Sequence, residues 1–240
     1  MYYGYGLGYG YYFDPTYILI IIAAVLALLA QLRVQFTFSK YSKVASSRGL
    51  TGAMVAEQIL RSEGIYDVGV AHVSGSLTDH YDPRTKMVNL SDSVYNMSSI
   101  AAVAVAAHEC GHAIQHNRGY VPLSLRSAIV PFANIGSKAS WIFIILGVLL
   151  SWNQTLITVG ILMFSLAVLF QIVTLPVEFN ASARALRILK SNGMLVDREN
   201  SKARSVLTAA ALTYVASAAS AILQLLRLII LFGGNNRDDR

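Results

Sequence analysis

The stretch YILIIIAAVLALLAQLRVQF, residues 17–36, decides what class of protein this chain belongs to. Arg33 is its one charged residue, and a helix of about 20 such residues spans the roughly 30 Å hydrocarbon core of a bilayer. Residues 128–150, 156–175 and 206–232 have a similar length and apolar character. The sequence therefore predicts a mainly α, polytopic membrane protein with about four transmembrane helices, whose first partner is the lipid bilayer.

The composition of the whole chain excludes several other classes. Of its 240 residues, 55% are hydrophobic and 13% are charged, against about 25% charged in soluble chains. The single cysteine, Cys110, excludes a disulfide-stapled secreted module. The net charge of +6 comes from Lys and Arg scattered between apolar runs, so we expect it to set membrane orientation and expect no nucleic-acid partner.

The positions of the basic residues predict an orientation in the membrane. The Gly/Tyr-rich opening, residues 1–15, has no Lys or Arg, so we interpret residues 17–36 as a retained anchor and not as a cleaved signal peptide. Basic residues follow this anchor, whereas the turn at residues 151–154 has no charge. By the positive-inside tendency, residues 37–127 and 176–205 lie in the cytoplasm.

The chain is predicted to consist of five parts. They are residues 1–36 with the first span, a cytoplasmic region over 37–127, a transmembrane hairpin over 128–175, a cytoplasmic helix within 176–205, and a last span with its tail over 206–240. Gln224 and Arg227 interrupt the last span. A charge in lipid is costly, so Arg227 is expected to reach the far interface or a protein partner.

The cytoplasmic region has the patterns of a small α+β unit. Residues 51–62 form a predicted helix, with Met54, Val55, Ile59 and Leu60 on its buried face. Residues 67–73 and 86–90 look extended, and residues 81–84 between them have the composition of a turn. Ser98 or Ser99 can cap a helix over residues 101–116, which ends at Asn117-Arg118-Gly119.

That last helix contains an H-E-x-x-H motif, His108-Glu109-Cys110-Gly111-His112. The two histidines lie one turn apart on the same face, so both imidazoles can bind one zinc ion at about 2.0 to 2.1 Å. Glu109 lies beside them, where it can act as the general base on a metal-activated water. Cys110 points away from this face and is expected to pack, and Gly111 is small enough for a close helix contact.

A catalytic zinc needs a third protein ligand. His116 is a poor choice because a straight helix places it about 12 Å along the axis from His108. The extended motif H-E-x-x-H-x-x-G-x-x-H is absent, because Gln115 and Arg118 occupy the required Gly and His positions. A carboxylate from elsewhere is therefore expected.

Glu178 is the strongest candidate for this carboxylate. It follows the third span on the side of the membrane that also holds His108. Pro176 can begin a new helix there, and Ala181 and Ala185 would let that helix approach the zinc helix. Alternatively, Glu178 only pairs with Arg184 or caps its helix.

Further residues could serve the same site. An exposed strand within residues 75–90 could hold a substrate backbone by strand addition, with its edge shaped by His80, Tyr81, Asp82 and Arg84, or Asp82 to Thr85 could be only a turn. A tetrahedral intermediate needs a donor besides zinc. The candidates for this donor or for a substrate contact are Tyr214, Arg184 and His72, and Asn180 could support the site from one turn beyond Glu178.

Four segments together resemble the bacterial YugP-type membrane zinc metallopeptidases. They are LTDHYDPR (77–84), AVAAHECGHAIQ (104–115), VTLPVEFNASARAL (173–186) and AAALTYVA (209–216), and the likeness extends over nearly the whole chain. More distantly, HECGH followed by EFNAS resembles the HtpX-like and CAAX-prenyl membrane proteases, which have Asp where this chain has Ser182. The resemblance implies a small cytoplasmic zincin-like core of gluzincin type, one Zn²⁺ on His108, His112 and Glu178, and Glu109 as base.

These observations favour a zinc-dependent membrane endopeptidase that hydrolyses peptide bonds of membrane or membrane-adjacent proteins. Its site would lie on the cytoplasmic side of a multi-pass protein in the bacterial cell membrane, with a membrane partner protein or a second copy as further partners. The main alternative is a catalytically silent adaptor or scaffold with a structural zinc, although such sites prefer four ligands, usually with thiolates. A third hypothesis is a transporter, in which Glu178 and Arg227 line a path through the bilayer.

Overall fold

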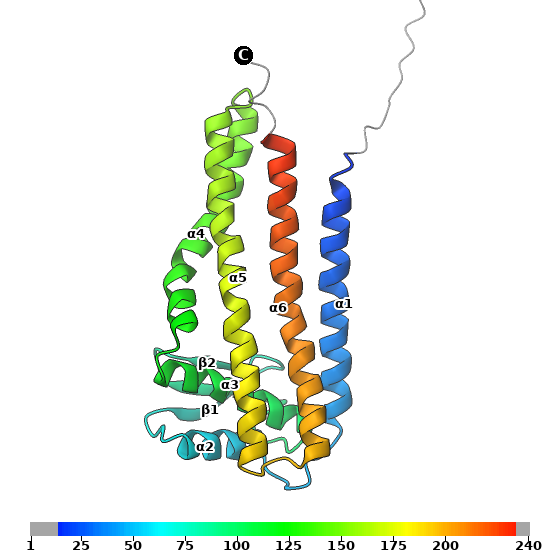
Figure 1. The fold of residues 1–240 in the computed structure, drawn as a ribbon, viewed down its shortest axis with the longest axis vertical. Coiled ribbons are helices and arrows are strands. Elements are labelled where there is room, and N and C mark those ends of the chain that lie inside the picture. The colour runs from blue at the N-terminus through cyan, green and yellow to red at the C-terminus, as the bar shows by residue number, and fades with distance from the viewer. Residues whose placement is uncertain (1–13, 234–240) are drawn as a thin grey trace, which may run out of the picture.

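The computed structural model describes residues 14–233, which form long helices and one small sheet (Figure 1). The opening Gly/Tyr tract therefore lies almost wholly outside the described residues. In chain order the elements are α1 (Tyr17–Ser42), α2 (Gly52–Ser62), β1 (Gly69–Val73), β2 (His80–Asp82), β3 (Met87–Ser91), α3 (Ile100–Asn117), α4 (Val121–Leu149), α5 (Gln154–Ser191) and α6 (Asp197–Phe232).

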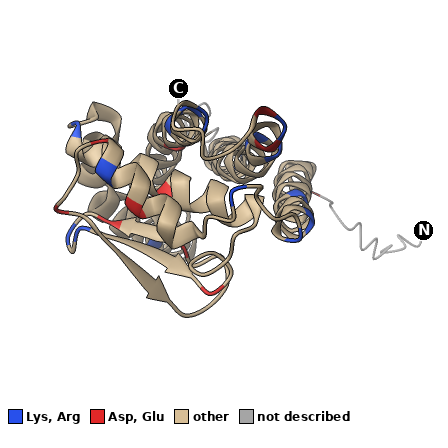
Figure 2. Ribbon diagram, turned by 90° about the horizontal axis from the view of Figure 1, so that it is seen from below, with Lys and Arg blue, Asp and Glu red and all other residues tan. Residues whose placement is uncertain are grey.

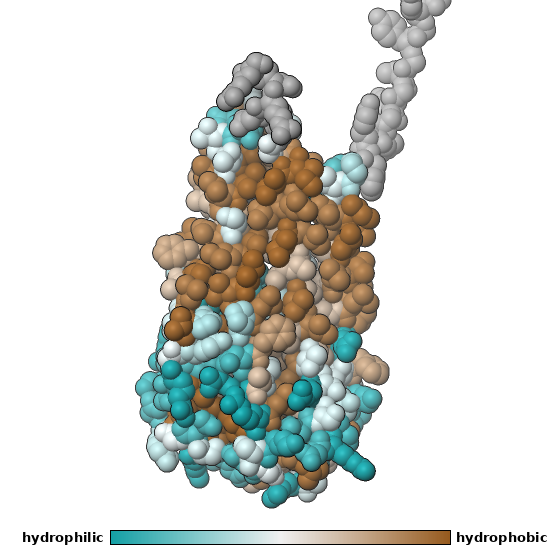
Figure 3. All heavy atoms as spheres, in the orientation of Figure 1, coloured by the Kyte–Doolittle hydropathy of each residue, from teal (hydrophilic) through white to brown (hydrophobic). Residues whose placement is uncertain are grey.

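Four of the helices, α1, α4, α5 and α6, are long and apolar enough to cross a membrane. They run side by side along the length of the molecule, while α2, α3 and the sheet gather at one end (Figure 1). The surface of the long helices is mostly hydrophobic, and the end with the sheet is mostly hydrophilic (Figure 3). The prediction of a mainly helical protein with four such helices is thus confirmed.

The helix α5 differs from the prediction that Pro176 begins a new helix. It runs without a break from Gln154 to Ser191 and contains Pro176 in its interior. A proline there removes one backbone hydrogen bond, but Val177, Ala181 and Ala185 immediately beyond it are buried against the rest of the molecule. Tertiary packing therefore keeps both parts in one helix. The predicted boundaries at 175/176 and 205/206 both fall inside helices, in α5 and α6.

The sheet has the strand order β1-β3-β2, with β1 parallel and β2 antiparallel to β3. The strand β2 lies within residues 75–90, where an exposed strand was one of the expectations, and its residues Tyr81 and Asp82 do not form the turn that was also predicted for them. The turn lies two residues later than the predicted 81–84, at residues 83–86, where Lys86 has a positive φ of 54°. A strand of only three residues has too few side chains to show an alternating pattern, so its pairing with β3 identifies it.

Both short helices begin where the sequence predicts. The hydroxyl of Thr51 accepts a hydrogen bond from the backbone N–H of Met54 (3.3 Å), and that of Ser99 accepts one from Ala102 (3.2 Å). One expectation for α2 is wrong: Met54 is 46% exposed, because the buried face of α2 is centred on Val55, Ala56 and Ile59.

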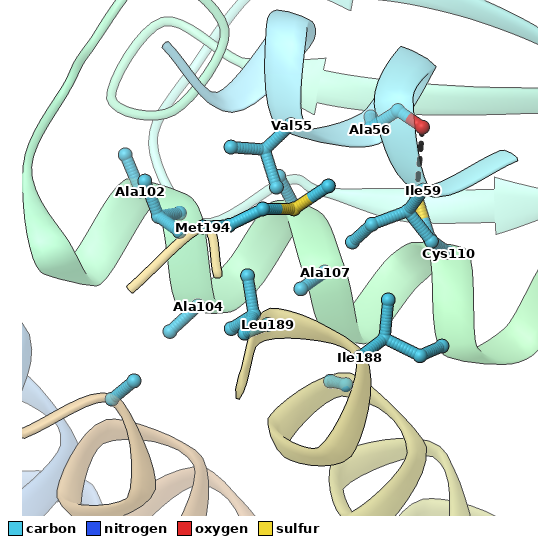
Figure 4. Packing of buried hydrophobic residues seen from close by; sticks show 14 of the residues in the cluster. Val55, Ala56, Ile59, Ala102, Ala104, Ala107, Cys110, Ile188, Leu189 and Met194 are labelled. Carbon is cyan, nitrogen blue, oxygen red and sulfur yellow. Dashed lines mark hydrogen bonds between the residues drawn. The ribbon is translucent and has the colours of Figure 1, made fainter. Parts of the chain in front are cut away.

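The polar end has its own apolar core between α2, α3, the sheet and the lower parts of α5 and α6. Figure 4 shows Val55 and Ile59 of α2 facing α3, with Leu189 and Met194 closing the core from the other side. Cys110 lies within this core, and its thiol contacts the carbonyl oxygen of Ala56 at 3.6 Å. The core thus holds α3 between the sheet side and the long helices.

Arg227 has partners within the chain, at the start of α1. Its guanidinium lies 3.3 Å from the carboxylate of Asp14, donates to the hydroxyl of Thr16 at 3.2 Å, and lies 4.6 Å from the centre of the Tyr17 ring. These contacts join α6 to the start of α1 at the end of the bundle far from the sheet (Figure 1). Lys and Arg residues colour the ribbon of the long helices at the opposite end, which faces the viewer in Figure 2.

Candidate metal centre

Three side chains from two helices meet at the border between the long helices and the polar end. Nε2 of His108 and Nε2 of His112, both on α3, lie 3.3 and 3.5 Å from Oε2 of Glu178 on α5. The carboxylate is 3% exposed and each imidazole 12%. Within the described residues, these three form the group that could hold a metal ion, with the ligand atoms inside 4.8 Å of one another.

The two helices approach closely because small residues lie at their crossing. A Cβ atom added to Gly111 would lie 2.6 Å from the carbonyl oxygen of Ala181, closer than real contacts allow. Ala181 and Ala185 are fully buried on the facing side of α5. The glycine inside the H-E-x-x-H motif therefore lets Glu178 reach the histidines.

Gln115 determines which nitrogen of His112 is protonated. Its amide nitrogen donates to the carbonyl of Val177 (2.8 Å) and to Oδ1 of Asn180 (3.0 Å), so its amide oxygen must face His112. That oxygen is 3.1 Å from Nδ1 of His112 and can only accept, so Nδ1 carries the proton. In its neutral form, His112 therefore presents the lone pair of Nε2 to Glu178.

Ser182 supports the other histidine. Its hydroxyl lies 3.1 Å from Nδ1 of His108. The resemblance to the more distant proteases placed an Asp at this position. The serine hydroxyl makes the corresponding contact without a negative charge, and it leaves Nε2 of His108 directed at Glu178.

The arrangement of Glu178 fits a bound cation. Oε2 is buried and has no hydrogen-bond partner, although it faces the lone pair of His112 Nε2 at 3.5 Å. Two electron-rich atoms at this distance repel unless a positive charge lies between them. Ligands about 2.1 Å from a tetrahedral zinc are about 3.4 Å apart, close to the observed 3.3 and 3.5 Å. The donor set therefore fits zinc.

Glu109 lies next to this group at a cavity of about 650 Å³. Its carboxylate is 8% exposed and accepts a hydrogen bond from the backbone N–H of Tyr81, at 3.0 Å, on the outer edge of β2. The cavity is lined from β2 and its flanks by Asp79, His80, Tyr81 and Pro83, from α3 by Glu109, His112 and His116, from α4 by Leu123, Ser124, Arg126, Ser127 and Val130, and from α5 and α6 by Glu178 and Tyr214.

The chain is similar to known proteins over most of its length. The model of a family described as "Putative neutral zinc metallopeptidase" matches residues 16–233. The chain belongs to this family. It is also 48% identical over 224 residues to "Putative membrane protease YugP" of Bacillus subtilis (strain 168), an alignment that covers 93% of this chain and 99% of that protein. No solved structure matches the chain.

The structure brings some of the other candidate site residues to the cavity and leaves others outside it. Tyr214 and His80 line the cavity. Asn180 does not line the cavity, and its side-chain oxygen accepts the hydrogen bond from the amide of Gln115. Arg184 donates to Asn180 at 2.7 Å and does not pair with Glu178. His72 lies exposed on β1, 2.6 Å from the carboxylate of Asp92. It is outside the cavity because β3 separates β1 from β2, the strand that lines the cavity.

Two side chains of the candidate metal centre were missed by sequence reasoning. Arg126 of α4 lies 3.4 Å from Oε1 of Glu178, and no local pattern connects these residues. Gln115 had a detectable signal, because it lies one turn after His112 on the same helix face and a fully buried amide needs partners. His116, in contrast, lies 2.8 Å from the Tyr81 hydroxyl through Nδ1, apart from the ligand group.

Asp79 is one of the acidic residues that line the cavity. Asp79 accepts hydrogen bonds from the backbone and the hydroxyl of Ser91, at 2.7 and 2.9 Å, and burial nevertheless raises the pKa of its carboxyl.

Burial also raises the pKa of the Cys110 thiol far above its usual range. Cys110 is thus a packed side chain next to the ligands, as its helical position predicts.

Proposed function

We propose that this protein is a zinc-dependent endopeptidase of the cell membrane. The observation that supports this most directly is the convergence of two imidazole Nε2 atoms on an unpartnered carboxylate oxygen, with Glu109 beside them at the same cavity. With three protein ligands, a tetrahedral ion keeps one position for water, as catalytic zinc sites do and structural sites do not.

Each side chain has a distinct role in this proposal. His108, His112 and Glu178 hold the ion, which supplies Lewis acidity toward a water and a peptide carbonyl. Glu109 takes the proton of the attacking water and delivers it to the leaving amine. Tyr214, which lines the cavity, is the candidate hydrogen-bond donor to the developing oxyanion.

The setting of the site suggests a zincin-like core of gluzincin type. A helix with the two histidines packs beside a small sheet, and a second helix provides the glutamate. The outer edge of β2 faces the cavity, so an extended substrate could pair there once Glu109 releases the N–H of Tyr81.

We further propose that the four long helices cross the bacterial cell membrane and that the site faces the cytoplasm. The length and hydropathy of α1, α4, α5 and α6 support the first part, and the basic residues that follow α1 support the second. In this orientation residues 37–127 form a cytoplasmic peptidase region, and the substrates are membrane or membrane-adjacent proteins.

The test measures zinc content and hydrolysis of unfolded casein by the full-length protein in detergent. We expect about one zinc per chain in wild type and in the matched variant Glu109→Gln, with hydrolysis reduced about 10³-fold or more in the variant. Equal inactivity of the two proteins, with zinc bound, over a broad panel of unfolded substrates would favour a silent adaptor.

A further inference from the structure

The first part of α4 lines the cavity and contains no buried residue. No residue from Val121 to Phe132 is buried, and burial in α4 begins at Ala133. Pro131 lies at this boundary, inside the helix. A proline in a helix interior removes a hydrogen bond and creates a point of bending. Pro131 is therefore a point at which α4 can bend, between residues 121–130 and the part of the helix that packs in the bundle.

This segment has two different faces. Leu123, Ser127 and Val130 line the cavity on the inner side. Val121 and Leu125 are exposed on the outer side, at 73% and 49%. The polar contact of the segment with another element is the 3.4 Å ion pair between Arg126 and Oε1 of Glu178, at the metal centre itself. The segment thus lies between the cavity on one side and the outside of the molecule on the other.

Apolar side chains also show how deep the cavity lies relative to the lipid-facing surface. Each long helix that lines it exposes an apolar residue directly after or before its cavity residue: Leu125 before Arg126, Phe179 after Glu178 and Val215 after Tyr214. The hydrophobic surface of the long helices reaches down to this border (Figure 3). The metal centre thus lies level with side chains that suit lipid and not water.

The cavity has a lateral side between α4 and α6. Residues of both helices line it, and both pack against α5 but hardly against each other. Resting on the peptidase function proposed above, we propose that the substrate is an extended segment of a membrane-spanning protein, which enters from the plane of the bilayer between α4 and α6. Residues 121–130 turn about Pro131 to admit it, and the contact of Arg126 with Glu178 closes behind it.

The activity test uses full-length protein in liposomes and one cleavable sequence in two forms. One form is attached to a single membrane span in the same bilayer, and the other is a soluble peptide. Pro131→Ala restores the missing helix hydrogen bond and stiffens the helix at this point, so cleavage of the anchored form should fall about tenfold while that of the peptide changes less than about twofold. Pro122→Ala is the matched control, because a proline in the first turn removes no helix hydrogen bond.

A second measurement does not depend on activity. A photoreactive benzoylphenylalanine replaces Leu123 on the cavity face or Leu149 at the far end of α4, in the Glu109→Gln background. The anchored reporter should attach at position 123 more than at 149, and Pro131→Ala should reduce this attachment. If wild type cleaves neither form, the peptidase proposal fails, and this attachment alone decides on lateral entry.

Lateral entry itself is overturned by either of two results. One is an equal effect of Pro131→Ala, including no effect, on the anchored and the soluble form. The other is attachment of the reporter at position 123 that is no greater than at 149 or is unchanged by Pro131→Ala. Loss of zinc content in Pro131→Ala would show instead that α4 supports the metal site.

Discussion

Two arginines on apolar helices each contact a carboxylate, and the two contacts differ in what surrounds the acid. At the far end of the bundle, Asp14 contacts Arg227 and also accepts hydrogen bonds from the backbone and hydroxyl of Thr16, so both of its oxygens have donors. At the border with the polar end, Arg126 lies near Oε1 of Glu178 while Oε2 remains buried without a donor. In the first pair both carboxylate oxygens have a partner, whereas in the second only Oε1 has one.

The comparison teaches how to tell a structural ion pair from a site. Burying a charge is costly, and a structural pair offsets the cost by giving every oxygen a donor. Oε2 of Glu178 instead faces an imidazole nitrogen whose proton is held on the other side of the ring by Gln115. Such an arrangement is costly by itself and becomes favourable when a cation binds.

Neutralising Glu178 should have the largest effect. Glu178→Gln keeps the shape of the side chain but loses the charge, so zinc affinity should fall more than about a hundredfold, beyond the usual effect of supporting residues. Zinc titration of the purified protein with a competing chelator measures this. Asp14→Asn and His116→Ala are the controls and should keep the affinity. A larger loss in His116→Ala than in Glu178→Gln would show that the third ligand is wrong.

Removing the support of His112 should have the next largest effect. Gln115→Leu has a similar volume but cannot accept the proton of Nδ1, so the ring is free to adopt the other tautomer. Zinc affinity should fall about 10- to 100-fold while the helical content stays the same. The same titration, with circular dichroism as the check on folding, measures it. An unchanged affinity would mean that Ser182 and the packing of α3 suffice.

Breaking the pair of Asp14 and Arg227 should change stability and not the site. Arg227→Met leaves Asp14 without its cation, and the free energy of unfolding should fall by about 1 kcal/mol, as for other polar contacts between membrane helices. Unfolding in mixed detergent micelles measures this loss. Zinc content should equal that of wild type, and a variant that loses zinc would contradict the separation of the two clusters.

The smallest effect is expected at Cys110, the sulfur nearest to the ligands in the chain. Its thiol is buried against Ala56, and burial raises its pKa, so almost no thiolate exists near neutral pH. Iodoacetamide should leave it unmodified in the folded protein and alkylate it after unfolding, with mass spectrometry as the readout. Rapid modification of the folded, zinc-loaded protein would show that the core around α3 is open.

Particular residues show how far sequence reasoning reaches. The predicted spans, the cap at Ser99 and the helix with the two histidines follow from patterns within one turn or one helix. Glu178 was found because membrane topology restricts which carboxylates can meet His108. Pro176 was misread, since a local preference for breaking a helix is weaker than the packing of Val177 and Ala181.

By itself, the sequence determined the length of the apolar helices, the spacing of the two imidazoles and the presence of a nearby carboxylate, because periodicity and hydropathy are local properties. Only the tertiary structure decided that Arg126 reaches Glu178, that Gln115 holds the proton of His112, and that β2 directs the N–H of Tyr81 to Glu109. These contacts join residues from different elements, and their distances depend on how closely α3 and α5 can pack at Gly111.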